Sequence, residues 1–314
     1  MITYCNNNVK IGFHLKIAYL IVIKTLKDFY LLLPEPLFNS NLYQCLTKLY
    51  NSMSNERLFN CYIGVDYSGA QTPTSSLKAL RIYMAEGNNL PVEISPLTGT
   101  KKYWTRQGIA EWLLLQLTKD NATLVGIDHG FSMPLRYFER YHLLPDWSLF
   151  LEDFKAHWPT DEEHMYVDFI RDDLHGQGAE RYGDSRWRRL CEQRCGAKSV
   201  FHFDIPGSVA KSTHAGIPWL LFIRQQLTKP VHFWPFDGWT VKGGQSVVVE
   251  AYPSLWKKQF AIDNRTNDQH DAYSIAAWMQ QTDRANLLAP YFQPSLLPHE
   301  QAMAQVEGWI FGVN

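Results

Sequence analysis

The stretch Cys61-Tyr-Ile-Gly-Val-Asp66-Tyr-Ser-Gly69 decides the fold of this chain. Five apolar or small residues run without interruption to an acid, and a serine and a glycine follow as turn residues. A short apolar run that is bounded by turn residues is typical of a buried strand. We therefore expect a buried strand whose carboxyl end opens, at Asp66, into a site.

The chain that follows extends this pattern. Residues 77–85 and 91–94 have strand-like composition, which predicts an antiparallel meander with the first strand. Residues 106–119 have apolar side chains on one face of a predicted helix. Thr123-Leu-Val-Gly-Ile-Asp128-His-Gly130 is then a second buried strand that ends in an acid. The predicted order of elements is β-β-β-α-β.

The second half of the chain supplies the remaining elements. Residues 135–198 show no strong strand signal, so we expect a helical insertion there. Further strands are predicted at 199–203, 231–236 and 246–252, with a helix at 217–227. Strands that alternate with helices predict an α/β fold.

Acidic residues follow the predicted strands. Asp66, Asp128 and Glu250 each end an apolar run. Asp268 and Asp271 lie three residues apart, on one face of a predicted helix. If the strands are neighbours the carboxylates converge, and their mutual repulsion is relieved by a cation with oxygen ligands such as Mg²⁺ or Mn²⁺. Taken singly, an acid at such a position is equally typical of a turn or a helix cap.

Four motifs occur in an order that a known family shares. They are Ile63-Gly-Val-Asp66, Gly126-Ile-Asp128-His-Gly-Phe-Ser-Met-Pro134, Glu250-Ala-Tyr-Pro253 and Asp268-Gln-His-Asp271-Ala272. On these motifs the chain from about Tyr62 onward resembles the predicted RNase H-like nuclease family described as domain of unknown function 429, itself similar to the Holliday-junction resolvase and actin-like superfamily. The resemblance implies an α/β, RNase H-like domain with a mixed five-stranded sheet flanked by helices. It also implies an acid on the first and fourth strands, a glutamate on the fifth, and an Asp-x-x-Asp-Ala helix.

The expected function is a metal-dependent nuclease that hydrolyses DNA or RNA through a two-ion Mg²⁺ or Mn²⁺ centre. The expected catalytic residues are Asp66, Asp128, Glu250, Asp268, Asp271 and His129, and the expected metal ligands among them are Asp66, Asp128, Glu250 and Asp271. His129 adjoins Asp128 and suits proton transfer, although a histidine beside an acid is more often structural. The alternatives are a catalytically silent RNase H-like binding module and an actin-like phosphotransferase, which needs more glycine-rich phosphate loops than the chain offers.

Two segments are candidates for contact with nucleic acid. Lys211, Thr213 and His214 fall in a segment flanked by Gly and Pro, at 206–218, which we expect to be either a loop that contacts substrate phosphate or a plain structural loop. Residues 181–198 interleave six basic side chains with aromatic ones. A solvated face with paired acids explains that pattern slightly better. The net charge of −1 leaves any contact with nucleic acid to local patches.

Residues 1–52 differ in composition from the rest, with five Lys and only two acids. Their apolar runs, at 17–23 and 29–33, are too short and too close to charges for a bilayer span of about 20 residues. We expect no membrane partner, and we expect an extension outside a core domain at 53–314, either an accessory helix or a stretch upstream of the true start. Five cysteines without a repeating spacing fit reduced thiols in a cytoplasmic protein.

A protein that begins at Met53 should therefore keep its fold. We expect its far-ultraviolet circular dichroism per folded residue and its melting temperature to match those of the full chain, because the predicted core starts after this residue. Insolubility, or a loss of several °C, would instead show that the first 52 residues pack on the domain.

Overall fold

The computed structural model describes residues 57–96, 101–174 and 176–314, and the isolated positions 22, 25–26 and 44. The chain divides into two compact units, Met1–Arg57 and Leu58–Asn314, and the description below concerns the second. This unit begins close to the boundary expected at residue 53. The expected extension at 1–52 lies almost wholly outside the described residues.

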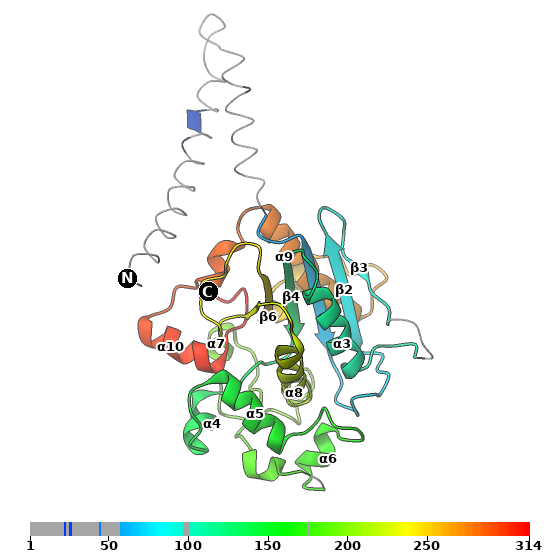
Figure 1. The fold of residues 1–314 in the computed structure, drawn as a ribbon, viewed down its shortest axis with the longest axis vertical. Coiled ribbons are helices and arrows are strands. Elements are labelled where there is room, and N and C mark those ends of the chain that lie inside the picture. Colours follow the sequence, from blue (N-terminus) through cyan, green and yellow to red (C-terminus); the bar gives the residue numbers. More distant parts are fainter. Residues whose placement is uncertain (1–21, 23–24, 27–43, 45–56, 97–100, 175) are drawn as a thin grey trace, which may run out of the picture. The chain divides into compact units, whose positions relative to one another are not determined.

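A six-stranded mixed sheet forms the centre of the second unit (Figure 1). Its strands are β1 (Cys61–Tyr67), β2 (Leu80–Glu86), β3 (Val92–Glu93), β4 (Thr123–Asp128), β5 (Val231–Phe233) and β6 (Ser246–Glu250). Their order across the sheet is β3-β2-β1-β4-β6-β5. β2 is antiparallel to β1 and β3, whereas β1, β4, β6 and β5 run parallel. The α/β class is confirmed, and the sheet has six strands where the resemblance implied five.

Helices cover both faces of the sheet. The helices are α3 (Arg106–Leu117), α4 (Leu135–Arg140), α5 (Trp147–His157), α6 (Val167–Arg171), α7 (Leu190–Cys195), α8 (Ala210–Gln226), α9 (Asn267–Arg284) and α10 (Pro298–Glu307), with 3-10 turns η2 (Gly178–Arg181), η3 (Pro253–Leu255), η4 (Lys257–Gln259) and η5 (Ala289–Phe292). Side chains alternate along each strand, so odd-numbered positions of β1, such as Ile63, pack with α3, α5 and α8. Even-numbered positions, such as Tyr62 of β1 and Leu124 of β4, face the other side of the sheet and belong to the same apolar cluster as Ile275 of α9.

The helical insertion expected at 135–198 is confirmed, since it contains α4, α5, α6, η2 and α7. Phe150, Leu151 and Phe154 of α5 are fully buried in the same apolar cluster as the residues of β1, α3 and α8. The insertion therefore extends the core on that face of the sheet. It does not form a core of its own.

Two expectations for the region between the insertion and β5 are wrong. Residues 199–203 form turns, because the Ser199 hydroxyl accepts a hydrogen bond from the Phe201 amide at 3.1 Å and closes the backbone locally. Helix α8 begins at Ala210, well before the predicted start at 217. Pro218 lies inside it and cannot donate to the His214 carbonyl, which accepts a hydrogen bond from the Thr160 hydroxyl at 2.9 Å instead.

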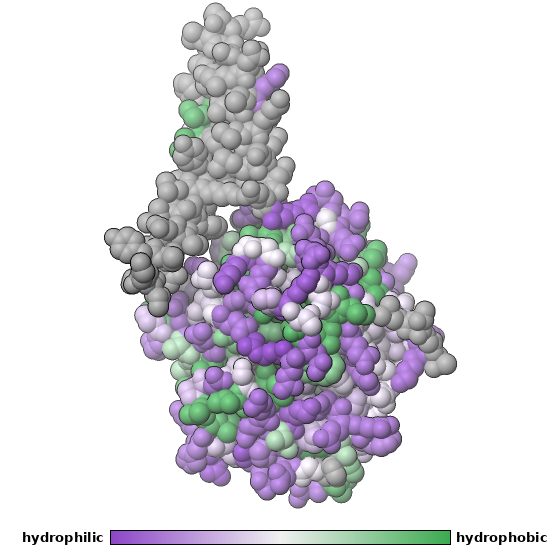
Figure 2. Space-filling view, in the orientation of Figure 1, coloured by the Kyte–Doolittle hydropathy of each residue, from purple (hydrophilic) through white to green (hydrophobic). Residues whose placement is uncertain are grey.

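The face of the unit that Figure 2 shows is mostly polar. Figure 2 shows hydrophilic residues over most of the visible face, with small apolar patches among them. Within the described parts of the chain, no helix is long and apolar enough to cross a membrane.

Two paired glycines let α9 lie unusually close to the sheet. Gly64 of β1 is directly opposite Gly126 of β4 in the parallel register. A Cβ atom on Gly64 would lie 2.2 Å from the Ala272 carbonyl oxygen, and one on Gly126 would lie 2.6 Å from a methyl carbon of Ile275. Only glycine fits at these two positions, since neither the helix backbone opposite Gly64 nor the stiff β-branched side chain of Ile275 opposite Gly126 can move aside easily.

Gly64→Ala should destabilise the protein by about 1–3 kcal/mol, the usual effect of overpacking a core, because the new methyl group pushes α9 away from β1. Urea unfolding followed by circular dichroism measures the change. Gly243→Ala is the matched control, since a Cβ atom there meets open space, and it should change stability by less than about 0.5 kcal/mol. Equal stability of the two variants would contradict the tight packing of α9.

Candidate functional site

Four acidic residues gather where β1 and β4 end, on the face of the sheet that α9 covers. Asp66 and Asp128 lie opposite each other in the register and continue the even-numbered positions that face α9. Helix α9 begins after Thr266, whose hydroxyl accepts a hydrogen bond from the Gln269 amide, and it carries Asp268 in its first turn and Asp271 in the next. The sequence predicted that the acids of these two strands and of the helix converge, and the structure places them at the same end of the sheet.

The Asp66 carboxylate is almost completely buried, with 2% of the residue exposed. Its Oδ1 accepts hydrogen bonds from the Ser68 amide at 3.0 Å and from the Ser68 hydroxyl at 2.6 Å. Burial raises the pKa of Asp66 to about 7, although the Ser68 hydrogen bonds oppose the shift, and the nearby charges of Asp268 and Asp271 add to it.

The Asp128 carboxylate is buried, and one of its oxygens has no hydrogen bond within the described residues to replace those it would make with water. Its Oδ1 is shielded from solvent and has no hydrogen-bond partner in the described part of the structure. Burial, followed by the negative charges of Asp66 and Asp271, raises the pKa of Asp128 well above its usual range. An unpartnered buried carboxylate oxygen is costly, so a bound group that supplied a partner for it would stabilise the site, and the described residues supply none.

Lys257 of η4 supplies a positive charge beside these four acids. Its ammonium lies 3.0 Å from both carboxylate oxygens of Asp271 but donates a well-oriented hydrogen bond only to Oδ2. The Lys257 carbonyl lies 2.9 Å from Nε2 of the buried His270, which ties this turn to α9. Asp268 is half-buried at the rim, where burial and then the charge of Asp271 raise its pKa, and Arg81 opposes the shift.

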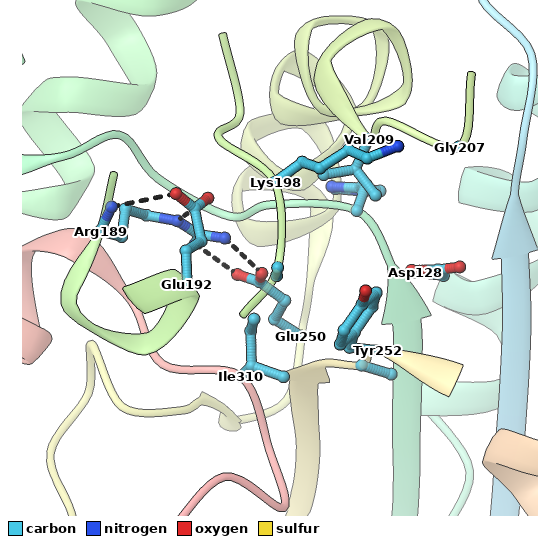
Figure 3. A pocket seen from close by; sticks show the side chains of 12 residues that line it. Asp128, Arg189, Glu192, Lys198, Gly207, Val209, Glu250, Tyr252 and Ile310 are labelled. Carbon is cyan, nitrogen blue, oxygen red and sulfur yellow. Dashed lines mark hydrogen bonds and ion pairs between the residues drawn. The ribbon is translucent and has the colours of Figure 1, made fainter. Parts of the chain in front are cut away.

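Glu250 is paired with Arg189, although its charge is near enough to Asp128 to help raise the pKa of that carboxyl, and its expected role as a metal ligand stays a prediction. It lies opposite Ile127 in the register, and both residues therefore face the α8 side of the sheet, whereas Asp66 and Asp128 face α9. Both Glu250 oxygens are held by the Arg189 guanidinium, at 2.6 and 2.7 Å. In Figure 3 the Asp128 carboxylate points away from Glu250.

Arg189 is the centre of a buried ionic network that sequence reasoning missed. Its Nε donates to Glu192 at 2.9 Å, and both residues are about 1% exposed. Glu307 of α10 closes the network, since its carboxylate accepts from the Leu190 amide at 2.7 Å and its carbonyl accepts from Arg189 at 3.3 Å. In the sequence Arg189 is one of several basic residues in a row, and nothing local distinguishes it. Only the alternation of side chains along β6 indicates that Glu250 points to the α8 side of the sheet, where it needs a cation.

His129 packs in the core instead of facing the carboxylates. Its ring contacts the rings of Tyr67 and Phe131 and lies against Gly216, where a Cβ atom would come within 2.5 Å of Nε2. Burial lowers the pKa of His129 to about 4, so the ring is neutral at pH 7. These contacts favour the structural role over the proton-transfer role.

The loop expected at 206–218 is largely helical instead, since Lys211, Thr213 and His214 lie in the first turns of α8, and their substrate-binding role stays a prediction. Lys211 pairs with Asp168, and the Thr213 hydroxyl accepts from the Gly130 amide at 2.9 Å. His214 is buried among aromatic rings, and burial lowers its pKa to about 3. Its Nδ1 bonds to the carbonyl of Ala210, one helical turn before it.

The basic stretch at 181–198 is largely engaged within the protein. Its ion pairs join Arg181 to Asp153, Arg186 to Asp184, Arg189 to Glu192 and Glu250, and Arg194 to Glu300. The paired face that the sequence favoured is therefore what the structure shows for most of this stretch. Lys198, at its end, is exposed and bonds only a backbone carbonyl, that of Pro206, in the contacts described.

The donor atoms at the site suit a hard divalent cation in kind, since they are carboxylate oxygens with too little positive charge around them. As the side chains stand, however, no three His, Cys, Asp or Glu residues in the described ranges are placed to hold a metal ion together. No family model, curated protein or solved structure matches the chain. Function is therefore inferred from the residues of the site alone.

The stability of the metal-free protein should fall as pH rises from about 4 to about 7. Across this range the folded protein keeps the proton on Asp66, whose pKa is raised to about 7, while the unfolded chain releases it near its ordinary value of 3.8. Asp66→Asn should flatten this dependence and raise the melting temperature at pH 8. The measurement is urea unfolding in EDTA at several pH values, with Glu163→Gln, an exposed carboxylate, as the control that keeps the wild-type slope.

Proposed function

We propose that this chain is an RNase H-like nuclease that hydrolyses phosphodiester bonds with Mg²⁺ or Mn²⁺ held by Asp66, Asp128 and Asp271. The observation that carries the proposal is the buried Asp128 Oδ1, which has no partner among the described residues and lies beside Asp66; burial and neighbouring carboxylates raise the pKa values of both Asp128 and Asp66. A cation is the partner that relieves both conditions at once.

The sheet supports the same proposal. Three antiparallel strands, β1 to β3, are followed by β4 and β6 parallel to β1, with acids at the carboxyl ends of the two central strands. Ligands of open α/β sheets bind outside the carboxyl ends of the strands. The site thus stands where a substrate reaches it, and the Asp-x-x-Asp-Ala helix supplies Asp271 from above the sheet.

The protein's own residues would divide the work. Asp66 and Asp128 anchor the cation from the sheet, Asp271 does so from α9, and Asp268 at the rim orients water or substrate. A bound Mg²⁺ or Mn²⁺ supplies the charge that activates a water and stabilises the leaving oxygen of a phosphodiester. Glu250 is left out of this set, because its charge is matched by Arg189 on the other face.

A non-catalytic binding module is the second candidate, and one observation favours it. Lys257 already neutralises part of the cluster through Asp271, as a structural cation would. The two candidates differ in what added metal does. A catalytic site should exchange the Lys257 contact for metal, whereas a silent one should keep it and show no metal-dependent stabilisation.

With Mn²⁺ or Mg²⁺ the purified protein should cleave a single-stranded, duplex or branched DNA or RNA, and Asp66→Asn and Asp128→Asn should each abolish cleavage. Asparagine keeps the size of the side chain but removes the charge that holds a hard cation. Circular dichroism should be unchanged, and the rise in melting temperature with Mn²⁺ should be lost in both variants.

Glu163→Gln changes an exposed carboxylate that pairs with His164, and this variant should cleave as the wild type does. Lys257→Gln should increase the stabilisation by Mn²⁺, because the competing cation is gone. A wild-type protein that is neither stabilised by Mn²⁺ nor active on any of these nucleic acids would leave only the binding module.

A further inference from the structure

A row of charged side chains crosses the sheet at the site, and one of its members is a cation. Arg81 of β2 lies directly opposite Asp66 of β1, which in turn lies opposite Asp128 of β4. Directly opposite residues of an antiparallel pair share a face of the sheet, with Cβ atoms about 4.5–5.5 Å apart. Arg81 therefore flanks the carboxylates on the side where β2 and β3 form the edge of the sheet (Figure 1).

The Arg81 guanidinium is anchored by one ion pair and keeps donors to spare. Its Nη1 donates to Glu93 at 2.8 Å, and Glu93 also accepts from the Gln269 side chain of α9 at 2.8 Å. Nε has no hydrogen-bond partner among the described residues. The side chain is 12% exposed, so a ligand can reach it from one side. A guanidinium has five N–H donors in a planar fork that matches the oxygens of a phosphate.

Three exposed lysines, Lys78, Lys101 and Lys102, continue the positive charge beyond Arg81. Residues 67–85 and 101–110, which contain these four cations, include no Asp or Glu. None of the three lysines forms an ion pair with an acid in the described ranges. Burial raises the pKa of Asp268, and the charges of Arg81 and Lys78 oppose the rise, so both cations lie near this acid at the rim of the site.

The segment that carries Lys102 is tied to the loop that carries Lys78. The Ser76 hydroxyl donates to the Tyr103 carbonyl at 2.9 Å and accepts from the Tyr103 amide at 3.0 Å. The centroid of the Tyr103 ring lies 5.0 Å from the guanidinium carbon of Arg81 and 5.4 Å from the ammonium of Lys102. These contacts gather the cations of both segments on one side of the carboxylates.

Most basic side chains on the α8 side of the sheet are, in contrast, already matched by acids. Arg189 pairs with Glu192 and Glu250, and Lys211 pairs with Asp168. A phosphate chain is attracted most strongly to cations whose charge is not matched within the protein. The β2 side of the site is therefore the side that favours a polyanion.

We propose that a nucleic-acid chain with a phosphodiester at Asp66 and Asp128 continues across β2, with its next phosphate on Arg81 and the following ones on Lys78 and Lys102. The position of the first phosphate rests on the proposed function. Arg81 binds its phosphate through the guanidinium fork, and the lysines bind theirs as point charges. All these contacts are to the backbone, so this surface binds every sequence alike.

The test measures binding separately from cleavage. A labelled oligonucleotide, single-stranded or duplex, is bound in EDTA at about 50 to about 200 mM KCl, and fluorescence anisotropy gives the dissociation constants. The proteins are the full-length wild type, Lys78→Gln, Arg81→Gln, Lys102→Gln and Lys242→Gln. Lys242 is the matched control, because it is exposed and lines a hollow beside β5, at the opposite edge of the sheet.

Each of the three variants on the β2 side should bind every sequence more weakly than the wild type does. The slope of log K against log salt should shrink by about 0.7 on a single strand and by about 0.9 on a duplex, the effect of one lost phosphate contact. Lys242→Gln should match the wild type. Lys78 and Lys102 are exposed, so their variants keep the fold, and circular dichroism checks the fold of Arg81→Gln.

The outcomes separate this inference from the nuclease proposal. A wild type that does not bind, or equal affinities and salt slopes in all five proteins, overturns the path across β2. A wild type that cleaves with Mn²⁺, while the three variants keep its KM and its salt slope, overturns the path and leaves the nuclease standing. Binding that depends on the three cations, in a protein that cleaves nothing, supports the path and removes the nuclease.

Discussion

The close packing of α9 against β1 and β4 is the constraint on which the site depends. Gly64 and Gly126 form a flat strip across two neighbouring strands, and the small and branched side chains of α9 lie directly on it. A helix at the ordinary distance from the sheet would carry Asp271 away from Asp66. Interiors are packed as densely as organic crystals, so the carboxylates cannot relax apart without opening this contact.

The same end of the sheet has two faces with opposite electrostatic character. On the α8 face Glu250 is matched by Arg189, and the Phe131 and Leu190 amides donate further hydrogen bonds to the carboxylates of the network. On the α9 face Lys257 pairs with Asp271, but a buried Asp128 oxygen has no partner among the described residues. Satisfied buried networks specify structure, whereas an unsatisfied one stores free energy that a ligand can release.

The sequence predicted most of the fold and about half of the site, and period-two alternation explains the difference. Unbroken apolar runs identified β1 and β4, and their terminal acids were placed correctly. Glu250 looked identical in sequence, but the facing of a side chain depends on register, and a shift of one residue moves it to the opposite face. The burial of His129 and His214 among aromatic rings is a property of tertiary packing, which a local motif does not report.

The Arg189 network also bears on how the molecule is assembled during synthesis. Its members come from α7, the end of β6 and the end of α10, and Ile310 forms a bridge with Glu250 beside them. The strands that carry Asp66 and Asp128 are synthesised first. The hydrogen bond from Arg189 to the Glu307 carbonyl of α10 can form only after residue 307 has been synthesised. The network therefore forms only after residues far along the chain have been synthesised, whereas the strands that carry Asp66 and Asp128 are made much earlier.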